Sequence, residues 1–267
     1  MYNVNLLAFM NMFEAVLQNG RKLTARNQEF LEVENYQLVI DPSQPFMSFP
    51  SRKYNIDYFK KEMIWKLSGD PFNESIKEHA KMWESVQNSD GSFNSNYGQY
   101  WFKELGLHKA FNELVADRES RRATIPMLKA EHIGHGVKDT VCTGHITFHI
   151  RDNRLNASIS MRSSDQIFGL GTDIPTFAVL QRMMLAMLTT VYHGDKAVML
   201  GSMTITADSS HIYSRHYEMV EKIWNSHEDL EYANMPYICT SEAFQLAACK
   251  GAVDPSWGEF SKWLVGE

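Results

Sequence analysis

Two neighbouring segments in the middle of the chain alternate between apolar and polar positions. Residues 146–150 and 155–161 both show this two-residue period, which is typical of strands with one buried face. Four polar residues, 151–154, separate the two segments and predict a tight turn, so we expect a hairpin. Because a hairpin folds back on itself, Cys142 near the start of the first strand should lie close to Arg162 at the end of the second.

The rest of the chain shows a mixture of helical and strand patterns. The predicted helices are 4–18, 56–67, 73–86, 102–114, 174–191 and 215–225, and the further predicted strands are 30–40, 122–128 and 197–206. This mixture predicts an α/β fold. A length of 267 residues without a Pro/Gly/Ser-rich linker favours a single catalytic domain over residues 1–267. The segment 228–267 shows no pattern that we can assign.

Composition and charge argue against several classes of protein. The net charge of −6 argues against a nucleic-acid surface, and no apolar run is long enough to cross a bilayer. The start of the chain lacks the basic and small-residue features of a signal peptide. The chain has three cysteines, Cys142, Cys239 and Cys249. Their odd number and their lack of metal-ligand spacing favour a reducing compartment, and hence the cytoplasm.

Cys142 is the main candidate for chemistry. A thiol beside a guanidinium has a lowered pKa because the positive charge stabilises the thiolate, which is the nucleophilic form. The hydroxyl of Ser163 next to Arg162 also suits a phosphate, which accepts hydrogen bonds from both groups. No metal site is predicted, because His132 and His135 lie in a loop without a carboxylate cluster.

The residues around the hairpin resemble the thymidylate synthase superfamily. Cys142 is followed twenty positions later by the arginine of an Arg-Ser-x-Asp motif, Arg162 to Asp165, and Gly169 follows. The resemblance implies that the cysteine is the catalytic nucleophile, that Arg162 and Ser163 belong to the substrate site, and that Asp165 and Gly169 belong to the folate site. It also implies a large mixed sheet with flanking helices and a homodimer formed through the sheet.

One position departs from the pattern of thymidylate synthases. They carry asparagine where this chain has Asp173, whereas the phage deoxycytidylate hydroxymethylases, a branch of the family, carry aspartate. An ionised carboxylate can accept from N4 of cytosine and stabilise a proton on N3, but it offers no donor to O4 of uracil. Asp173 is therefore expected to select cytosine and to assist catalysis. The alternative is that it only caps the helix that begins before Pro175.

Three more matches imply catalytic and cofactor residues. Glu62 precedes a Gly-Asp pair on a predicted helix, as the family's catalytic glutamate does, and a buried carboxylate with a raised pKa could relay protons to the base. Trp83 and Tyr97 resemble the tryptophan that lines the folate side of the pocket and the tyrosine that helps to remove the C5 proton. The alternatives are a solvated helix face for Glu62 and ordinary aromatic packing for the other two.

Five further residues are implied to bind the nucleotide. Arg26 matches a phosphate-binding arginine in a degraded motif, and a solvated basic loop explains it equally well. Arg121 and Arg122 match two arginines that cross the dimer interface to the partner's phosphate, although adjacent arginines are otherwise surface charge. His211 and Tyr213 match a His-x-Tyr motif that holds the sugar 3′-hydroxyl.

These matches imply an enzyme that transfers a one-carbon unit from 5,10-methylenetetrahydrofolate to C5 of dCMP and adds water, giving 5-hydroxymethyl-dCMP. Val86 and Thr143 stand where synthases often have tryptophan and histidine, and such smaller or more polar walls favour an ordered water. The alternatives are a dCMP methyltransferase that uses hydride transfer and a nucleotide-binding protein without turnover. The sequence does not decide whether the sugar of the substrate is ribose or deoxyribose.

Overall fold

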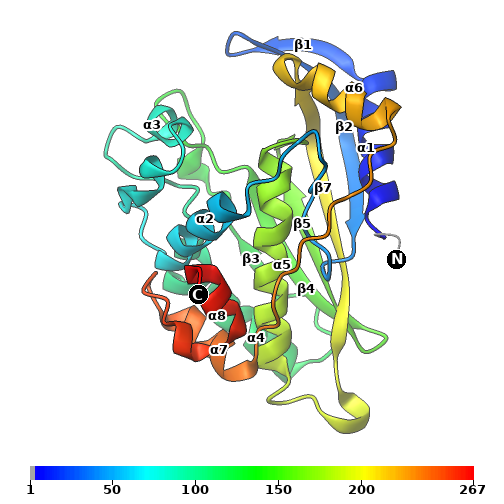
Figure 1. Ribbon diagram of the computed structural model, residues 1–267. Coiled ribbons are helices and arrows are strands. Elements are labelled where there is room, and N and C mark those ends of the chain that lie inside the picture. The colour runs from blue at the N-terminus through cyan, green and yellow to red at the C-terminus, as the bar shows by residue number, and fades with distance from the viewer. Residues whose placement is uncertain (1–3) are drawn as a thin grey trace.

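A mixed sheet of seven strands forms the centre of the computed structural model, which describes residues 4–267 (Figure 1). The strands are β1 (Arg21–Ala25), β2 (Gln28–Ile40), β3 (Thr124–Pro126), β4 (Thr143–Arg151), β5 (Arg154–Met161), β6 (Ser164–Asp165) and β7 (Met199–Tyr213). Their order is β1-β2-β7-β5-β4-β3, and β6 pairs with β7. β7 runs parallel to β5 and β6, while the other pairs are antiparallel. The predicted α/β class is confirmed.

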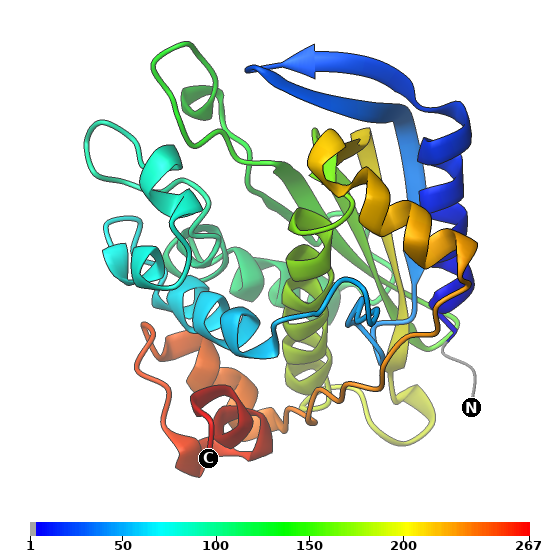
Figure 2. The ribbon, with the colours of Figure 1, turned by 45° about the horizontal axis from the view of Figure 1, so that its top comes forward.

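Helices surround a long central helix, α5. The α-helices are α1 (Leu6–Asn19), α2 (Ile56–Ser68), α3 (Met82–Val86), α4 (Gly106–Ala116), α5 (Gly169–Leu188), α6 (Tyr217–Asn225), α7 (Thr240–Ala248) and α8 (Glu259–Val265). α5 lies across the sheet, with α1 and α6 together on one side of it and α2, α7 and α8 on the other (Figure 1, Figure 2). Because α5 is covered by the sheet and by helices, it is apolar almost all round.

Among residues 4–267 the helices cover one face of the sheet, and no helix covers the other (Figure 1, Figure 2). Residues that pair directly across strands share a face, and those on the helix side, such as Leu38, Ile205 and Ile159, are buried. The other face carries a row of exposed or half-buried residues that run across five strands. In order they are Val39, Thr204, Ser158, Thr147 and Thr124. Small hydroxyl side chains therefore dominate this open face.

The predicted hairpin is confirmed. β4 and β5 are joined by Asp152 and Asn153, which have φ of 50° and 57°. Positive φ at both positions is what the type I′ turn of a two-residue hairpin requires. Thr143 pairs with Met161 at the far end, so the residues just outside this pair, 142 and 162, are neighbours.

Three strands differ clearly in length from the prediction, and one of them, β4, begins at Thr143 rather than at 146. β7 reaches Tyr213 instead of ending at 206, because the long β2 pairs with it up to Phe30, and His211 is therefore inside a strand. β3 covers only Thr124–Pro126 of the predicted 122–128, since a proline has no N–H with which to extend the ladder. The basic segment before β2 is also a strand, β1, which the sequence did not predict.

Three helical predictions need correction. The helix predicted at 73–86 consists of two short pieces, the 3-10 turn Glu74–Glu78 and α3. The helix predicted from 102 begins at Gly106, after a π-helical turn at Gln99–Lys103. The helix predicted from 174 begins at Gly169, so Pro175 lies inside α5 rather than at its start.

The segment that the sequence left unassigned packs behind α2 as α7 and α8. The ring of Trp263 lies 6.3, 6.2 and 5.6 Å from those of Phe46, Phe59 and Phe260. Trp263 is therefore part of the packing between α8 and the helix that carries Glu62. The last helix is thus anchored on the domain through this tryptophan.

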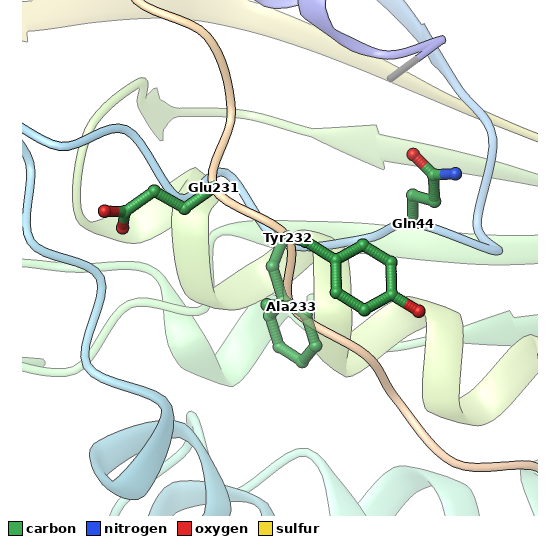
Figure 3. A pocket seen from close by; sticks show the side chains of 5 residues that line it. Gln44, Glu231, Tyr232 and Ala233 are labelled. Carbon is green, nitrogen blue, oxygen red and sulfur yellow. The ribbon is translucent and has the colours of Figure 1, made fainter. Parts of the chain in front are cut away.

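The connection to α7 crosses the loop that follows β2. The backbone N–H of Glu231 donates to the Ser48 carbonyl at 2.7 Å, and the Glu231 carboxylate accepts from the Ser48 hydroxyl at 3.2 Å. Figure 3 shows this crossing, with Gln44 and Tyr232 around a small pocket. Its volume of about 10 Å³ suits at most one water, so this pocket is not a nucleotide site.

Two glycines bring the end of α2 against the turn that carries Tyr97. Gly69 ends α2 with φ of 58°, a conformation that glycine adopts without strain. A Cβ on Gly98 would lie 1.7 Å from the carbonyl oxygen of Lys66, so no other residue permits this close approach. The Tyr97 side chain is thereby held over the last turn of α2.

Candidate active site

Cys142 and Arg162 meet at the end of the β4–β5 hairpin, as predicted. The Arg162 Nη2 lies 3.6 Å from Cys142 Sγ, and the Arg162 backbone N–H donates to the Cys142 carbonyl at 2.9 Å. The guanidinium also donates to the carbonyls of Val141 at 2.9 Å and Thr140 at 2.6 Å. Backbone groups thus hold this cation beside the sulfur, and Ser163 follows it as a half-buried residue.

The expected lowering of the Cys142 pKa is wrong for the free protein. Burial raises the pKa of the thiol to about 11. Arg162 and Arg26 lower it, while Asp173 and Asp139 raise it. Desolvation of the thiolate therefore outweighs the neighbouring guanidinium. The sulfur is a thiol at neutral pH and has to lose its proton when it attacks.

Glu62 lies on α2 and is paired with a buried lysine. Its carboxylate is 2.7 Å from Lys66 Nζ, one helical turn later, and the two side chains are only 8% and 2% exposed. Lys66 Nζ also donates to Thr176 Oγ1 on α5 at 3.2 Å. The solvated-face alternative for Glu62 is therefore wrong, because both charges of the pair are removed from water.

Asp173 lies inside α5, four residues after its first residue, and not at the N-cap. The backbone N–H groups of Ile167 and Phe168, just before the helix, and of Gly169, its first residue, are instead directed at the Asp165 carboxylate at 3.1–3.4 Å. The capping alternative for Asp173 is therefore wrong.

The electrostatic surroundings make Asp173 an unusual carboxyl group. Burial raises the pKa of Asp173 to about 7. Lys66 lowers it, and the carboxylates of Glu62 and Asp165 raise it. A carboxyl group with this pKa can hold or release a proton near neutral pH, which suits a group that exchanges a proton with a base.

Tyr97 connects the two sides of the site. Its ring is only 4% exposed, and its hydroxyl accepts a hydrogen bond from Thr143 Oγ1 at 3.2 Å. Burial raises its pKa well above the usual value, and the negative charges of Asp173 and Cys142 raise it further. Tyr97 is therefore a phenol at neutral pH that lies close enough to both Cys142 and Asp173 to feel their charges.

Trp83 lies in a small aromatic cluster apart from the main core. Its ring is 4.9 Å from that of Trp65 and 5.9 Å from that of Phe93, and it is 7% exposed. Its Nε1 donates to the Tyr58 hydroxyl at 3.0 Å. Burial, followed by the Glu62 carboxylate, raises the pKa of Tyr58. Trp83 is thus linked to Glu62 through Tyr58, and its contact with folate stays a prediction.

Asp165, Gly169 and an exposed ring lie together at the start of α5. Phe168 is 50% exposed, and its ring lies 5.4 Å from the Arg52 guanidinium and 4.8 Å from the His216 ring. Arg52 is buried, and its Nε donates to the Ile167 carbonyl at 2.9 Å. An aromatic surface, a carboxylate and a guanidinium thus meet here.

His211 and Tyr213 occupy alternate positions of β7, so they share a face of the strand. Their rings are 5.0 Å apart, and each contacts Phe30 across the strand pair, at 5.4 and 6.1 Å. Cys142 and Asp165 both affect the pKa of Tyr213, which is raised mainly by burial. These two residues therefore belong to the neighbourhood of the nucleophile.

Arg26 stands at the tip of the β1–β2 hairpin, where it and Asn27 have φ of 49° and 60°. Its side chain is exposed, and its charge lowers the pKa of Cys142. In Figure 2 the hairpin projects beyond the sheet. Arg26 is thus an exposed cation at the rim of the site.

Arg121 and Arg122 do not reach the Cys142 site of their own chain. Both are exposed, and Arg122 is paired with Glu113 at 3.3 Å. The next residue, Ala123, accepts a hydrogen bond from Phe148. Phe148 lies six residues along β4 from Cys142, which corresponds to about 20 Å.

Sequence reasoning missed Lys66. Its spacing of four residues from Glu62 on a predicted helix was a signal for an ion pair. That both partners are buried could not be seen, because it depends on α5 and on the aromatic cluster around α2.

Other kinds of site are absent from the part of the chain that the structure describes. Among residues 4–267 no group of three or more His, Cys, Asp and Glu side chains could hold a metal ion. The same residues include no helix that is long and apolar enough to span a membrane. A pocket of about 380 Å³ lies on the outer side of α2, where Trp65 and Lys250 line it, and it includes none of the candidate residues.

Comparisons with known proteins assign the chain to a family of enzymes. A family model described as "Thymidylate synthase" matches residues 7–244, and the chain belongs to that family. The chain is 31% identical over 184 residues to the deoxycytidylate 5-hydroxymethyltransferase of Enterobacteria phage T2, covering 65% of this chain and 74% of the relative. The phage T4 protein of the same name is 30% identical over the same coverage.

A relative with another base in its name also matches. The deoxyuridylate hydroxymethyltransferase of Delftia phage PhiW-14 is 28% identical over 183 residues, covering 62% of this chain and 48% of the relative. The relatives thus support folate-dependent one-carbon transfer to a pyrimidine nucleotide. Because the two names differ in the base, only the residues of the site can indicate which base this chain uses.

Proposed function

We propose that this protein is a deoxycytidylate 5-hydroxymethyltransferase that acts on dCMP in the cytoplasm. The observation that carries the proposal is Asp173, a carboxyl group with a raised pKa that lies inside α5 and is not used as a cap. Its protonated form donates to N3 of cytosine and accepts from the N4 amino group. Moving that proton to N3 leaves both hydrogen bonds in place, which is the state that activates the ring.

Cys142 attacks C6 of the base. The bond between Sγ and C6 forms, the C5=C6 electron pair moves to C4–C5, and the C4=N3 pair moves to N3, which takes the proton from Asp173. The sulfur has a raised pKa, so its own proton passes to a water molecule during the attack, which the partial exposure of Cys142 permits, and the nearby Arg162 stabilises the negative charge that develops on sulfur. C5 then has the character of an enamine carbon.

The residues at the start of α5 fit a folate. The exposed Phe168 ring offers a flat apolar surface, and Asp165 and Arg52 lie beside it to hold polar groups. Bound 5,10-methylenetetrahydrofolate would supply the one-carbon unit to C5. Asp165, Gly169 and Trp83 are proposed to face it.

Tyr97 and Thr143 suit a water near C5. Their hydroxyl groups are hydrogen-bonded to each other beside Cys142. Such a pair can orient a water that takes the C5 proton and passes it to bulk water, while the folate nitrogen would leave the one-carbon unit as an exocyclic methylene. A neutral water then adds to this methylene and loses its proton, and Cys142 leaves C6 as the ring double bond re-forms, which gives a hydroxymethyl product. Glu62, held by Lys66, is proposed to relay protons on the other side of the base.

We propose that the nucleotide phosphate binds to Arg162, Ser163 and Arg26, with His211 and Tyr213 at the sugar. Arg121 and Arg122 lie too far from their own site and are proposed to serve the site of a second copy. The open face of the sheet, with its row of hydroxyl side chains, is the proposed dimer interface. This interface is a self-complementary arrangement typical of two-fold homodimers.

Incubation with dCMP and methylenetetrahydrofolate, followed by mass analysis of the nucleotide, tests the proposal. We expect a mass gain of one hydroxymethyl group and no rise in dihydrofolate absorbance. Stoichiometric dihydrofolate would identify a dCMP methyltransferase instead. Conversion of dUMP in preference to dCMP would overturn the role of Asp173, and absence of any product with both nucleotides would overturn the enzyme assignment.

A further inference from the structure

Lys66 is a buried ammonium group for which the proposed reaction has so far no step. Its side chain is 2% exposed, and lysine is almost never buried to this degree unless it is paired. Its Nζ lies 2.7 Å from Glu62, 3.2 Å from Thr176 Oγ1 and 5.1 Å from the centroid of the Tyr97 ring. The ammonium therefore contacts three separate elements of the site.

The contact with Thr176 ties Lys66 to the helix face that carries Asp173. Thr176 comes three residues after Asp173 on α5, so the two side chains are neighbours on one side of the helix. Lys66 in turn lowers the pKa of Asp173, whereas burial and the Glu62 carboxylate raise it. Lys66 is thus the nearby positive charge that opposes two carboxylates.

The groups that act on Asp173 come from every element packed around it. They are Lys66, Glu62 and Tyr58 on α2, Tyr97 before the π-helical turn, Cys142 before β4, and Asp165 on β6. Lys66 is the cation of this set. Without it, two carboxyl groups in a desolvated site would compete for ionisation, and one would keep its proton.

We propose that Lys66 is a positioning residue that holds the proton shared by Asp173 and the base on N3 of cytosine, and that it thereby helps the enzyme to select cytosine over uracil. This inference rests on the function proposed above. An ionised Asp173 with its proton on N3 leaves the ring electron-poor, so Cys142 can attack C6. A neutral Asp173 leaves the ring unactivated and can donate its proton in a hydrogen bond to O4 of uracil.

Lys66→Met removes the charge and keeps most of the side-chain volume. With dCMP we expect kcat to fall on the order of 10²-fold, the lower end of what proton transfer by a positioned group contributes. KM for dCMP should change by less than about threefold, because the neutral carboxyl group still pairs with cytosine. The ratio of kcat/KM for dCMP over dUMP should fall at least about tenfold.

The pH profile provides a readout that a loss of packing would not move. The free enzyme needs one proton on Asp173 to bind cytosine, so kcat/KM for dCMP should fall as the pH rises through about 7. Removal of a nearby opposite charge raises a carboxyl pKa by about one unit or more. The falling limb in Lys66→Met should therefore shift to higher pH by at least about one unit.

Two further variants make the result independent of folding problems. Lys61→Met removes an exposed lysine from the same helix and should leave rate, base ratio and pH limb unchanged. Thr176→Val keeps the shape of the side chain but removes the hydroxyl that holds Lys66. It should lower the dCMP over dUMP ratio of kcat/KM and shift the falling pH limb upward, as Lys66→Met does, but by a smaller factor. If Lys66→Met does not fold, Thr176→Val provides the test of the inference.

The outcomes separate this inference from the proposed function. Suppose that the unmodified enzyme hydroxymethylates dCMP, but that Lys66→Met keeps both the dCMP over dUMP ratio of kcat/KM and the pH of the falling limb. The proposed role of Lys66 is then wrong, and the proposed function stands. Thr176→Val takes the place of Lys66→Met in this test if Lys66→Met does not fold. If the unmodified enzyme makes no hydroxymethyl-dCMP, the proposed function is overturned, and this inference with it. A lower base ratio together with a shifted limb, absent in Lys61→Met, supports both.

Discussion

The two walls of the candidate site are built in different ways. On the nucleophile wall, Cys142 and Arg162 are neighbours through hairpin register, and backbone carbonyls hold the guanidinium. On the base wall, Glu62 and Lys66 come from α2 and Asp173 from α5, more than a hundred residues later, and side-chain charges hold one another. The first wall needs one correct turn, whereas the second needs two helices to be docked correctly.

This difference changes how each wall should respond to mutation. Backbone carbonyls fix the position of Arg162, so its guanidinium should not move when a neighbouring side chain is substituted. The effect of a substitution in the nucleophile wall should therefore stay local. Charges that balance one another in a desolvated site are coupled, so a change in one alters the protonation of the others. Substitutions in the nucleophile wall should therefore abolish the chemistry, while those in the base wall should change what is chosen and at which pH.

The largest effect is expected for Cys142→Ala. Release of C5 tritium from labelled dCMP should fall by about 10⁵-fold or more, because no other group near C6 can form the covalent bond. Cys239→Ala and Cys249→Ala are the matched controls and should exchange at the normal rate. Normal exchange by Cys142→Ala would remove the nucleophile wall from the mechanism.

Asp173→Asn should change the choice of base, because the amide cannot supply the proton that N3 of cytosine takes during the attack. The amide can donate to O4 of uracil and accept from N3–H, so the ratio of kcat/KM for dCMP over dUMP should fall by up to about 10⁴-fold. Competition between the two labelled nucleotides measures this ratio directly. Glu84→Gln, on the surface of α3, is a suitable control for the loss of one carboxylate. An unchanged ratio would show that Asp173 does not read the base.

Arg121→Ala should weaken activity by about 10²-fold, the value of one bidentate contact between arginine and phosphate. Mixed with inactive Cys142→Ala, it should recover activity, since a heterodimer has one site with an intact cysteine and the partner's intact arginine. Random exchange of subunits predicts recovery of about a quarter of the normal sites. Two folded variants that exchange subunits and still do not complement would exclude the shared site.

The smallest effect concerns the thiol in the free protein. With a pKa of about 11, the fraction of Cys142 present as thiolate at pH 8 is about 200-fold below that of an ordinary cysteine, and the greater nucleophilicity of a basic thiolate restores about tenfold. Iodoacetamide should thus modify Cys142 roughly 20-fold more slowly in the folded than in the urea-unfolded protein. Peptide mass analysis follows each cysteine separately. Equal rates would show that burial does not control this thiol.

The sequence alone determined the nucleophile wall. The two-residue periods on either side of 151–154 predicted the hairpin, and hairpin register is a local property, so the contact between Cys142 and Arg162 followed from it. The mixed α/β class and the family resemblance were also readable, since both rest on patterns along the chain. The full length of β7 was not, because it depends on its pairing with β2.

Only the tertiary structure decided the properties of the base wall. Asp173 looked like a possible helix cap because Pro175 follows it, and its place inside α5 became clear only when Asp165 was seen to accept the N–H groups before the helix. The raised pKa of Cys142 and of Asp173 depends on burial, which the sequence does not specify residue by residue. Lys66 was missed in the sequence, and only the docking of α2 on α5 makes it a buried partner of Glu62 that also acts on Asp173.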